Sequence, residues 1–453
     1  MTHFQTWHAL TLLHLAAVAS GLLLYVSLTH SGRQRRPPSA AVAWVLALIA
    51  FPYLALPVYL LLGTRKLAHT QHEAGRGGND GPAATRGLDL PRAQHCSSAR
   101  FHGSGVQALD ELLVLLGGAV QRIDIEMFIF RDDAVGVQII AALEAAVHRG
   151  VRVRVLLDGL GALIGHRRTA RALHRAGVTL RWFSPLRLQL RPGHGNLRNH
   201  RKLVLVDGSA MWSGGRNFAA EYFLGARRAP PWKDLSFVLE GGIVTSAVHG
   251  FEADWAIATG ERAPVEALPC MPVSAGAPAQ LLPSGPDRRD DTAYALYLSA
   301  IHRADRRVWA ATPYFVPDAA LQQALLHAVR RGVEVRLLLP ARSNHHMADI
   351  ARERSLRELS RAGVDIRLLP TMLHAKLVLV DEVFASCGSI NLDGRSLFLN
   401  YELNTLFFAR EDIHTLEAWF DAQCAPASAY VVVTPGWFRD VGEGLVRGVG
   451  FQL

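Results

Sequence analysis

Apolar residues form two long runs at the start of the chain and many short runs after it. Residues 7–29 and 40–63 each lack Asp, Glu, Lys and Arg, and the polar stretch HSGRQRRPPS separates them. A helix needs about 20 apolar residues to cross a hydrocarbon core about 30 Å thick. The pattern therefore predicts a two-helix transmembrane hairpin over residues 1–64.

A cleaved signal peptide is the alternative interpretation of the first run. That run lacks a basic leading segment and a clear small-residue cleavage site, and the second run follows closely, which favours an uncleaved anchor. Basic residues flank both ends of the second run, so the positive-inside rule fixes no orientation. These residues are Arg33, Arg35, Arg36, Arg65, Lys66 and Arg76.

Short apolar runs alternate with helical patterns beyond residues 65–100, a stretch whose Gly, Ala, Arg and His content is typical of a flexible linker. The segments IEMFIF and VRVRVLL predict strands, and VGVQIIAALEAAVHRG between them predicts a helix that ends at Gly150. This order of strand, helix and strand indicates right-handed crossovers and a sheet covered by helices.

The same pattern returns in the second half of the chain. VRVRVLLDG followed by LHRAGVTLRWF is matched there by VEVRLLLPA followed by LSRAGVDIRLL. An internal duplication of this kind predicts an α/β fold with two similar domains related by a pseudo-twofold axis. We place the domains at residues 101–265 and 286–425, with a Pro- and Ala-rich linker at 266–285 and a C-terminal tail at 426–453.

Two near-identical decapeptides, NHRKLVLVDG and LHAKLVLVDE, occupy equivalent places in the repeat. Their aliphatic core, Leu203–Val206 in the first copy, predicts a strand buried on both faces, and a His and a Lys two residues apart project to the same side. Random placement would give roughly 0.01 copies of the spacing H-x-K-x4-D in this composition. The residues that fill this spacing are His200, Lys202, Asp207, His374, Lys376 and Asp381.

A small-residue turn follows each Asp at the same distance, GGRN at 214–217 and GSIN at 388–391. Glycine lets a backbone approach closely, and the polar side chains of these turns can donate hydrogen bonds to a phosphate. The candidate donors are Asn217, Ser389 and Asn391.

Lysine is rare in this chain, because only four of its 48 basic residues are lysines, and the two decapeptides hold two of them. A compact ammonium suits a site where charge builds up on phosphate oxygens. Two imidazoles can provide a nucleophile and an acid for phosphodiester cleavage near neutral pH. The four cysteines show no metal-site spacing, so we expect neither a metal nor another cofactor.

The paired motifs resemble the HKD signature of the phospholipase D superfamily, and most closely that of the membrane-anchored bacterial cardiolipin synthases. The resemblance extends to GGRNFAAEY, WKD, TPYFVPD and GSINLDGRSLFLNYELN. It implies transfer of a phosphatidyl group from one phosphatidylglycerol to another through a phosphohistidine, with release of glycerol. It also implies that His200 is the nucleophile, that His374 is the acid and base, and that the protein is a multi-pass protein of the bacterial cytoplasmic membrane.

Each catalytic histidine needs a carboxylate that fixes its tautomer. Our candidates are Glu402 and Asp234, with Glu221 as a substitute. The motif aspartates Asp207 and Asp381 belong to the signature, but we expect them to hold the ends of strands rather than to touch phosphate. Two departures from the family pattern are Gly215, where a Ser is common, and the C-terminal sequence.

Three other functions compete with phosphatidyl transfer between lipids. A phospholipase D would use the same residues with water or a small alcohol as acceptor. A nuclease would need aromatic stacking platforms beside a basic groove, and no such cluster lies near either motif. A non-catalytic scaffold would not need both motifs intact. The net charge of +9 suits an anionic lipid surface, so we expect phosphatidylglycerol and the membrane as partners and no nucleic acid, while the oligomeric state stays open.

Overall fold

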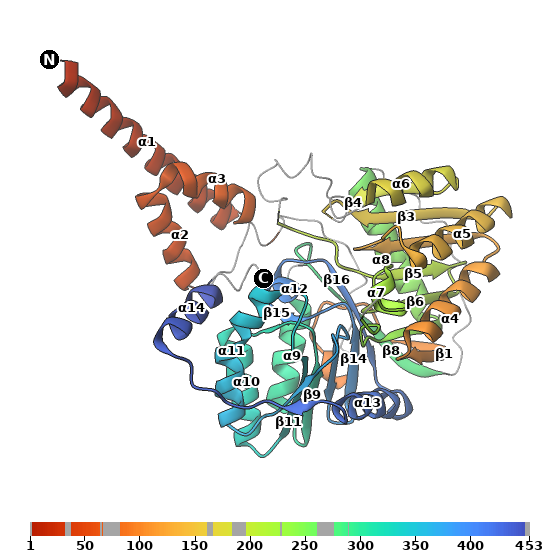
Figure 1. The fold of residues 1–453 in the computed structure, drawn as a ribbon. Helices are drawn as coiled ribbons and strands as arrows, with labels where there is room; N and C mark the ends of the chain where they lie inside the picture. Colours follow the sequence, from red (N-terminus) through yellow and green to blue (C-terminus); the bar gives the residue numbers. More distant parts are fainter. Residues whose placement is uncertain are drawn as a thin grey trace.

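The computed structural model describes residues 2–31, 38–63, 66, 82–160, 166–183, 196–226, 229–260, 276–288 and 290–448. Figure 1 shows two parts, a group of apolar helices at the N-terminus and a large α/β body. The apolar helices are α1 (Thr2–Ser31), α2 (Pro38–Ala50) and α3 (Pro52–Leu62).

The first apolar run forms one helix, as the sequence predicts, whereas the second run does not. Within the described residues, only Leu10–Thr29 of α1 is a helical segment long and apolar enough to cross a membrane. The second run breaks at Phe51, because Pro52 starts a new helix there. The ring of His14 lies 5.8 Å from that of Tyr53, and the ring of Tyr25 lies 5.2 Å from that of Tyr59. Helix α3 therefore runs in the same direction as α1, and the expected two-helix hairpin is seen only in part, because the second apolar run forms two helices, α2 and α3.

The body is built on one 15-stranded sheet whose strand order is symmetric about its centre. From the centre outwards, the first half has the order β1, β7, β6, β5, β2, β3, β4, and the second half has β8, β16, β14, β13, β9, β11, β12, with β17 added at its edge. The central strands β1 and β8 pair antiparallel. This arrangement confirms the predicted pair of similar α/β domains.

The strands of the first half are β1 (Gln94–His102), β2 (Arg122–Met127), β3 (Arg152–Asp158), β4 (Thr179–Phe183), β5 (Leu203–Val206), β6 (Ala210–Gly214) and β7 (Ser236–Gly241). Those of the second half are β8 (Ala277–Ser284), β9 (Arg307–Ala311), β11 (Glu334–Pro340), β12 (Asp365–Leu369), β13 (Leu377–Val380), β14 (Phe384–Gly388), β16 (Glu402–Phe407) and β17 (Ser428–Ala429). A separate pair joins β10 (Phe315–Val316) to β15 (Leu392–Asp393).

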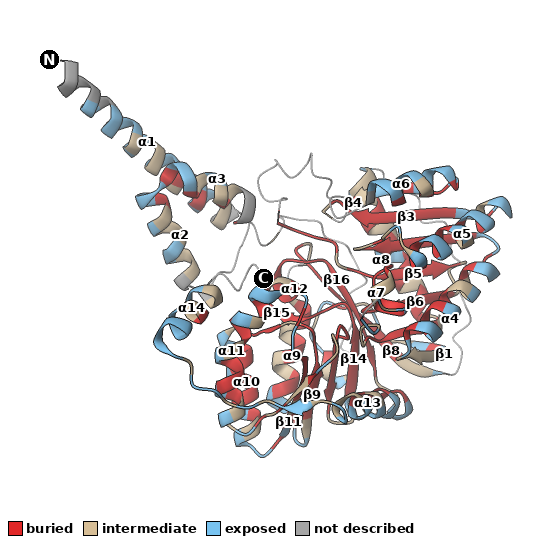
Figure 2. Cartoon of the chain, viewed as in Figure 1, coloured by how far each residue is buried: buried red, intermediate tan, exposed pale blue. Residues whose placement is uncertain are grey.

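Helices cover the sheet in both halves. In the first half they are α4 (Gly105–Gly118), α5 (Ala134–His148), α6 (His166–Arg175), α7 (Ala220–Phe223) and α8 (Ile243–Thr259), after the short 3-10 helix η1 (Ala83–Thr85). In the second half they are α9 (Thr292–Arg303), α10 (Ala319–Arg330), α11 (His346–Arg361), α12 (Gly394–Phe398), α13 (Arg410–Cys424) and α14 (Trp437–Gly448). Figure 2 shows most strands of the sheet buried beneath them, whereas β1 is mostly of intermediate burial.

Local sequence explains the elements that lead to the motifs. Asp133 caps α5 by accepting hydrogen bonds from the backbone N–H groups of Val135 and Gly136, and Gly150 follows the helix with a φ of 87°. Strand β5 is buried at every position, as its aliphatic composition predicts. The predicted strands and helix around α5 are therefore present with small changes in their ends.

Three stretches that the sequence pattern presents as linkers or tail contain regular structure. Strand β1 begins inside the predicted linker 65–100, and β8 lies inside the predicted linker 266–285. The tail 426–453 holds β17 and α14. Strand β1 carries polar and charged residues at most positions, and β8 contains two prolines, so neither has the apolar pattern of a buried strand.

An aromatic cluster fixes the two halves to each other beneath the central strands. The ring of Phe407 lies 5.0 Å from Phe101 and 5.3 Å from Phe237, both edge-on. These contacts join β16 of the second half to β1 and β7 of the first half.

Candidate active site

Two short backbone bridges connect each motif to the opposite half. Asn199 pairs with Tyr401, and the N–H of His200 donates to the carbonyl of Tyr401 over 2.9 Å. Lys233 pairs with Leu373, and the N–H of His374 donates to the carbonyl of Lys233 over 2.7 Å. Each motif histidine is thus placed beside the backbone of the other half.

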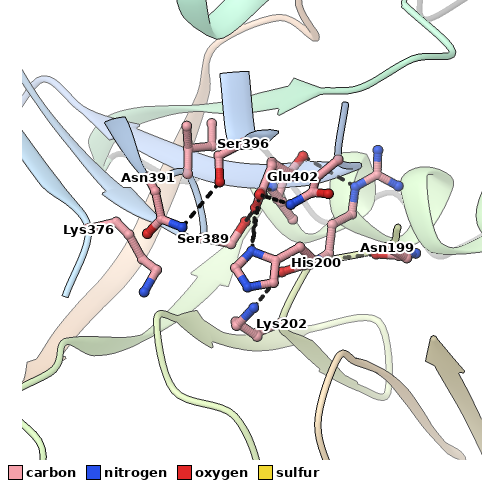
Figure 3. Close-up of polar contacts among 12 residues, drawn as sticks. Asn199, His200, Lys202, Lys376, Ser389, Asn391, Ser396 and Glu402 are labelled. Atoms are coloured by element: carbon pink, nitrogen blue, oxygen red, sulfur yellow. Dashed lines mark hydrogen bonds and ion pairs between the residues drawn. The ribbon is translucent and has the colours of Figure 1, made fainter. Parts of the chain in front are cut away.

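The first histidine receives its carboxylate from the second half. His200 Nδ1 lies 3.0 Å from both carboxylate oxygens of Glu402, which is the first residue of β16. Figure 3 shows the ring of His200 between the carboxylate of Glu402 and the side chain of Lys202. Because an ionised carboxylate only accepts hydrogen bonds, Nδ1 carries the proton and Nε2 keeps its lone pair.

The second histidine receives its carboxylate from the first half. His374 Nδ1 donates to Asp234 Oδ2 over 2.8 Å, and Asp234 lies just before β7. Asp234 and Glu402, the two predicted carboxylates, therefore each lie within hydrogen-bond distance of a motif histidine of the other half. Glu221 is not such a partner, because its carboxylate pairs with Arg131 over 2.8 Å.

Both motif lysines are buried within the site. Lys202 Nζ donates to the carbonyl of His200 over 2.6 Å. Lys376 Nζ lies 2.9 Å and 3.1 Å from the two ring nitrogens of His374 and also donates to its carbonyl. Arg201, between His200 and Lys202, turns away to pair with Asp254 on α8, as the alternation of side chains predicts.

Burial and charge lower the pKa values of the two motif histidines and the two motif lysines. Burial lowers the pKa of His200 to about 4, against the opposing charge of Glu402. Burial and the charge of Lys376 lower the pKa of His374 to about 3. Burial likewise lowers the pKa of Lys202 to about 7 and that of Lys376 to about 8. Both imidazoles are thus neutral near pH 7, and the lysine charges are poorly solvated, which favours an anionic ligand.

The carboxylates stay ionised despite their burial. Burial raises the pKa of Glu402, but the charge of His200 and its hydrogen bond lower it more, so the net shift is downward. The same balance, with His374 in place of His200, lowers the pKa of Asp234. Ser389 Oγ adds a hydrogen bond to Glu402 Oε2 over 2.5 Å.

The motif aspartates lie outside the cluster of imidazoles and lysines. Asp207 and Asp381 have φ values of 51° and 49°, a left-handed conformation that Asp tolerates better than most residues. The carboxylate of Asp207 accepts three backbone N–H bonds, from Val120, Gln121 and Arg122. Asp381 does the same with the N–H groups of residues 305–307. These contacts agree with a role at the strand ends.

The polar residues of the two turns are bonded within the protein. Asn217 Nδ2 donates to the hydroxyl of Tyr222 over 2.9 Å, and Asn391 Nδ2 donates to Ser396 Oγ over 3.2 Å. Ser389 donates to Glu402 as described above. Their contact with a substrate phosphate remains a prediction, and their observed role is to position neighbours.

Sequence patterns alone missed the aromatic walls of the site. The ring of Phe128 lies 5.0 Å from His200, and those of Tyr222 and Trp232 lie 4.9 Å and 5.7 Å from His374. They explain the difference in exposure, because the side chain of His200 is 12% exposed and that of His374 only 4%. In the sequence these aromatic residues could have been found only from their place close to β2, Asn217 and Asp234.

The arrangement offers two neutral imidazoles beside two ammonium groups, and the ammonium of Lys376 lies 3.1 Å from Nε2 of His374. Such a site can bind a phosphodiester, attack its phosphorus with one imidazole and move a proton with the other. In the described part of the chain, no three His, Cys, Asp or Glu side chains gather as a metal site requires.

The chain is similar to known proteins along nearly its whole length. A family model described as "Cardiolipin synthase, PLD-like domain" matches residues 112–228 and 297–424, and one described as "Phospholipase_D-nuclease N-terminal" matches residues 19–63. Cardiolipin synthase A of Pseudomonas aeruginosa strain LESB58 is 34% identical over 444 residues, covering 92% of this chain and 90% of that protein. Cardiolipin synthase A of Pseudomonas putida is 32% identical, covering 88% and 87%.

A solved structure supports the fold independently of close sequence similarity. Phosphatidylserine synthase from Haemophilus influenzae matches with a TM-score of 0.60 at 14% identity, covering 80% of this chain and 96% of that chain. The sequence relatives confirm the predicted family, and the solved structure supports the fold. The chain belongs to the cardiolipin synthase family of phospholipase D-like proteins.

Proposed function

We propose that the protein is a membrane-anchored cardiolipin synthase that transfers the phosphatidyl group of one phosphatidylglycerol to a hydroxyl of a second one and releases glycerol. The observation that carries this proposal is the crosswise pairing of His200 with Glu402 and of His374 with Asp234 around two buried lysines. Neither half alone holds a complete imidazole and carboxylate pair.

The reaction has two steps that use the imidazoles in turn. First, Nε2 of His200 attacks phosphorus, the N–P bond forms, the P–O bond to glycerol breaks, and His374 protonates the leaving oxygen. Then His374 takes the proton from the acceptor hydroxyl, whose oxygen forms the new P–O bond while the N–P bond breaks. The negative charge of the bound phosphodiester raises the pKa of both imidazoles, so His374 gains its proton together with the substrate.

The lysines and the aromatic walls support this chemistry. Lys202 and Lys376 stabilise the charge on the non-bridging oxygens of the transition state. Phe128, Tyr222 and Trp232 keep the imidazoles away from bulk water, which favours a lipid hydroxyl over water as acceptor. The assignment of His200 as nucleophile rests on the family pattern and on its greater exposure toward the site.

The apolar helices place the reaction at a lipid surface. We propose that α1 crosses the bacterial cytoplasmic membrane, with α2 and α3 packed beside it in the apolar layer. Lys66, just after α3, pairs with Asp291 over 2.9 Å and donates to the carbonyl of Gly285 over 3.0 Å. This contact joins the anchor to the second half of the catalytic body.

The test uses full-length protein in phosphatidylglycerol liposomes with a metal chelator present. We expect cardiolipin and glycerol as products, detected by mass spectrometry. Phosphatidic acid as the only phospholipid product would identify a hydrolase instead. The double variant His200→Ala, His374→Ala should be inactive, whereas His148→Ala, at the exposed end of α5, should keep full activity. Activity of the double variant would refute the mechanism.

A further inference from the structure

Helix α14 has its apolar side chains on the outside. Trp437, Phe438, Val441 and Leu445 are 71%, 85%, 43% and 72% exposed. At 100° per residue these four side chains lie within one arc of about 100°. A surface helix of a globular protein normally buries such a stripe against the core.

The polar face of α14 is the one that contacts the protein. Glu443 accepts a hydrogen bond from Arg357 of α11 over 2.5 Å, and Glu443 is buried. Arg447 donates to the side chain of Gln322 on α10 over 2.9 Å. Ion pairs and hydrogen bonds therefore hold α14 in place while its aromatic and aliphatic side chains point away from the body.

The apolar surface continues beyond α14. Val431 and Val433, in the segment that leads to the helix, are 74% and 57% exposed. Ile350 of α11 is 40% exposed and precedes Glu353 and Arg357 by three and seven residues, so it lies on the face of α11 that α14 contacts. An apolar surface of this kind on a soluble body marks a site of contact.

The position of α14 indicates what it contacts. Figure 1 shows α14 on the side of the second half from which α1, α2 and α3 project. Its C-terminal part packs through Val446 beside Tyr314 and Val316, and β10 pairs with β15 next to the turn that carries Asn391. Helix α14 therefore lies on the same side of the body as the anchor, and its C-terminal part packs beside β10.

We propose that α14 is a second membrane contact, an in-plane helix whose Trp437, Phe438, Val441 and Leu445 side chains enter the interface of the bilayer. Aromatic residues at the level of the headgroups and an apolar face with charged residues opposite are typical of such helices. With α1 as the first contact, the α14 contact fixes the tilt of the catalytic body and turns the active site toward the lipid surface. This inference rests on the proposed membrane anchorage and not on the identity of the lipid products.

The test places a fluorescent label at single cysteines of the full-length protein in phosphatidylcholine and phosphatidylglycerol vesicles. The background carries Cys270→Ser and Cys424→Ser, because Cys96 and Cys387 are buried. Labels are introduced by Phe438→Cys and Leu445→Cys on α14, by Leu13→Cys on α1, and by Thr415→Cys on the exposed face of α13 as the matched control.

Brominated lipids should quench the labels at residues 438, 445 and 13 but not the label at residue 415. If lipid quenches the label at residue 13, either of two results at residue 438 would overturn the inference. One is access to a water-soluble quencher equal to that at residue 415. The other is protection from both quenchers, which would indicate that a protein partner or a second copy covers the helix. A label at residue 13 that lipid does not quench would overturn the anchorage itself.

A variant series gives an independent readout of the same contact. Replacing Trp437, Phe438 and Leu445 together by Ser should lower turnover severalfold in vesicles and leave turnover in detergent micelles unchanged, because micelles impose no orientation on the body. Equal losses in both systems would indicate a folding defect and contradict the inference.

Discussion

The two halves of the active site carry the same motif but different partners for it. In one, His200 is paired with the long carboxylate Glu402, which also accepts a hydrogen bond from Ser389. In the other, His374 is paired with the shorter Asp234, and Gly215 takes the place of the serine. A Cβ atom added at Gly215 would lie 2.2 Å from Asp234 Oδ1.

This difference shows how a duplicated fold acquires two distinct imidazoles. The motif residues are copied with the domain, so they cannot by themselves divide the roles of nucleophile and acid. The partners of the motif have diverged, since serine goes with glutamate in one half and glycine with aspartate in the other. The walls have diverged too, because Tyr222 and Trp232 close the space around His374 only.

Removing either imidazole is the strongest way to test the division of roles. His200→Ala and His374→Ala should each lower turnover on phosphatidylglycerol on the order of 10⁴-fold or more. A phosphodiester with a nitrophenol leaving group needs no acid for its departure, so His374→Ala should still release nitrophenol and accumulate a phosphohistidine that mass spectrometry locates at residue 200. An adduct at residue 374 in His200→Ala would reverse the assignment.

Neutralising the carboxylates tests whether each acts across the boundary between halves. Asp234→Asn and Glu402→Gln should each lower kcat by ~10³-fold, since the imidazolium formed in the reaction loses its stabilising charge. Glu402→Gln should slow formation of the phosphohistidine, and Asp234→Asn should slow its transfer to the acceptor. Glu221→Gln is the matched control and should leave kcat within about twofold, because Glu221 pairs with Arg131. Stopped-flow measurement of the two steps separates these outcomes.

Replacing Gly215 and Ser389 by alanine, one at a time, tests whether the two carboxylates depend on different neighbours. Gly215→Ala should lower kcat about 10²-fold, because the new Cβ displaces the carboxylate that orients His374. Ser389→Ala removes one hydrogen bond to a charged group, which corresponds to a loss of about tenfold. Equal effects at both positions would show that the halves are more alike than their contacts indicate.

We expect kcat/KM to stay high down to a low pH and to fall early as the pH rises. A lowered imidazole pKa keeps the base form down to lower pH, so the acid limb should lie near pH 4 rather than at the ordinary histidine pKa of about 6.5. The lowered lysine pKa values of about 7 and about 8 mean that charge is lost as pH rises through them, which weakens phosphate binding. Lys202→Arg should lower activity at every pH but remove the first alkaline step. An acid limb near pH 6.5 would contradict this burial-based view.

Substitution of the motif aspartates should have the smallest effect on catalysis, and the effects in the two halves should be nearly equal. Asp207→Ala and Asp381→Ala should each destabilise the protein by about 3 kcal/mol, because three backbone donors and a left-handed residue lose their support. The Asn variants should cost about 1 kcal/mol and keep kcat within about threefold. Thermal unfolding of detergent-solubilised protein provides the measurement, and a loss of kcat without a loss of stability would place these carboxylates in the chemistry.

Much of the fold was accessible from the sequence because its signals are local. The aliphatic run Leu203–Val206 and the capped helix α5 predict their own structure from composition and spacing. The repeat then predicts the symmetric order of strands. Strands β1 and β8 were missed because they are stabilised by pairing with distant strands, β1 with β7 and β8 with β16, and with each other, which no local pattern records.

The site was predictable in its residue types but not in its connections. The need for a carboxylate beside each histidine pointed to Asp234 and Glu402, yet nothing in the spacing assigned either one to a particular histidine. The pairing follows from the bridges Asn199–Tyr401 and Lys233–Leu373, which join segments about 140 to 200 residues apart in sequence. Glu221 lies close to the site in sequence, but its side chain turns to Arg131.

The direction of α3 bears on whether the anchor crosses the membrane an odd or an even number of times. If the apolar helices lie in the membrane as proposed, the parallel directions of α1 and α3 predict that the second apolar run leaves the lipid on the side where it entered, so that the chain would cross an odd number of times. On that arrangement we expect the amino terminus and the catalytic body in different compartments. Every arginine and lysine that flanks these helices follows α1 in the sequence, so all of them count toward one side, which the positive-inside rule assigns to the cytoplasm. A peptide tag placed before Thr2 should therefore be cut by protease added outside intact spheroplasts, while a tag after Leu453 should be protected.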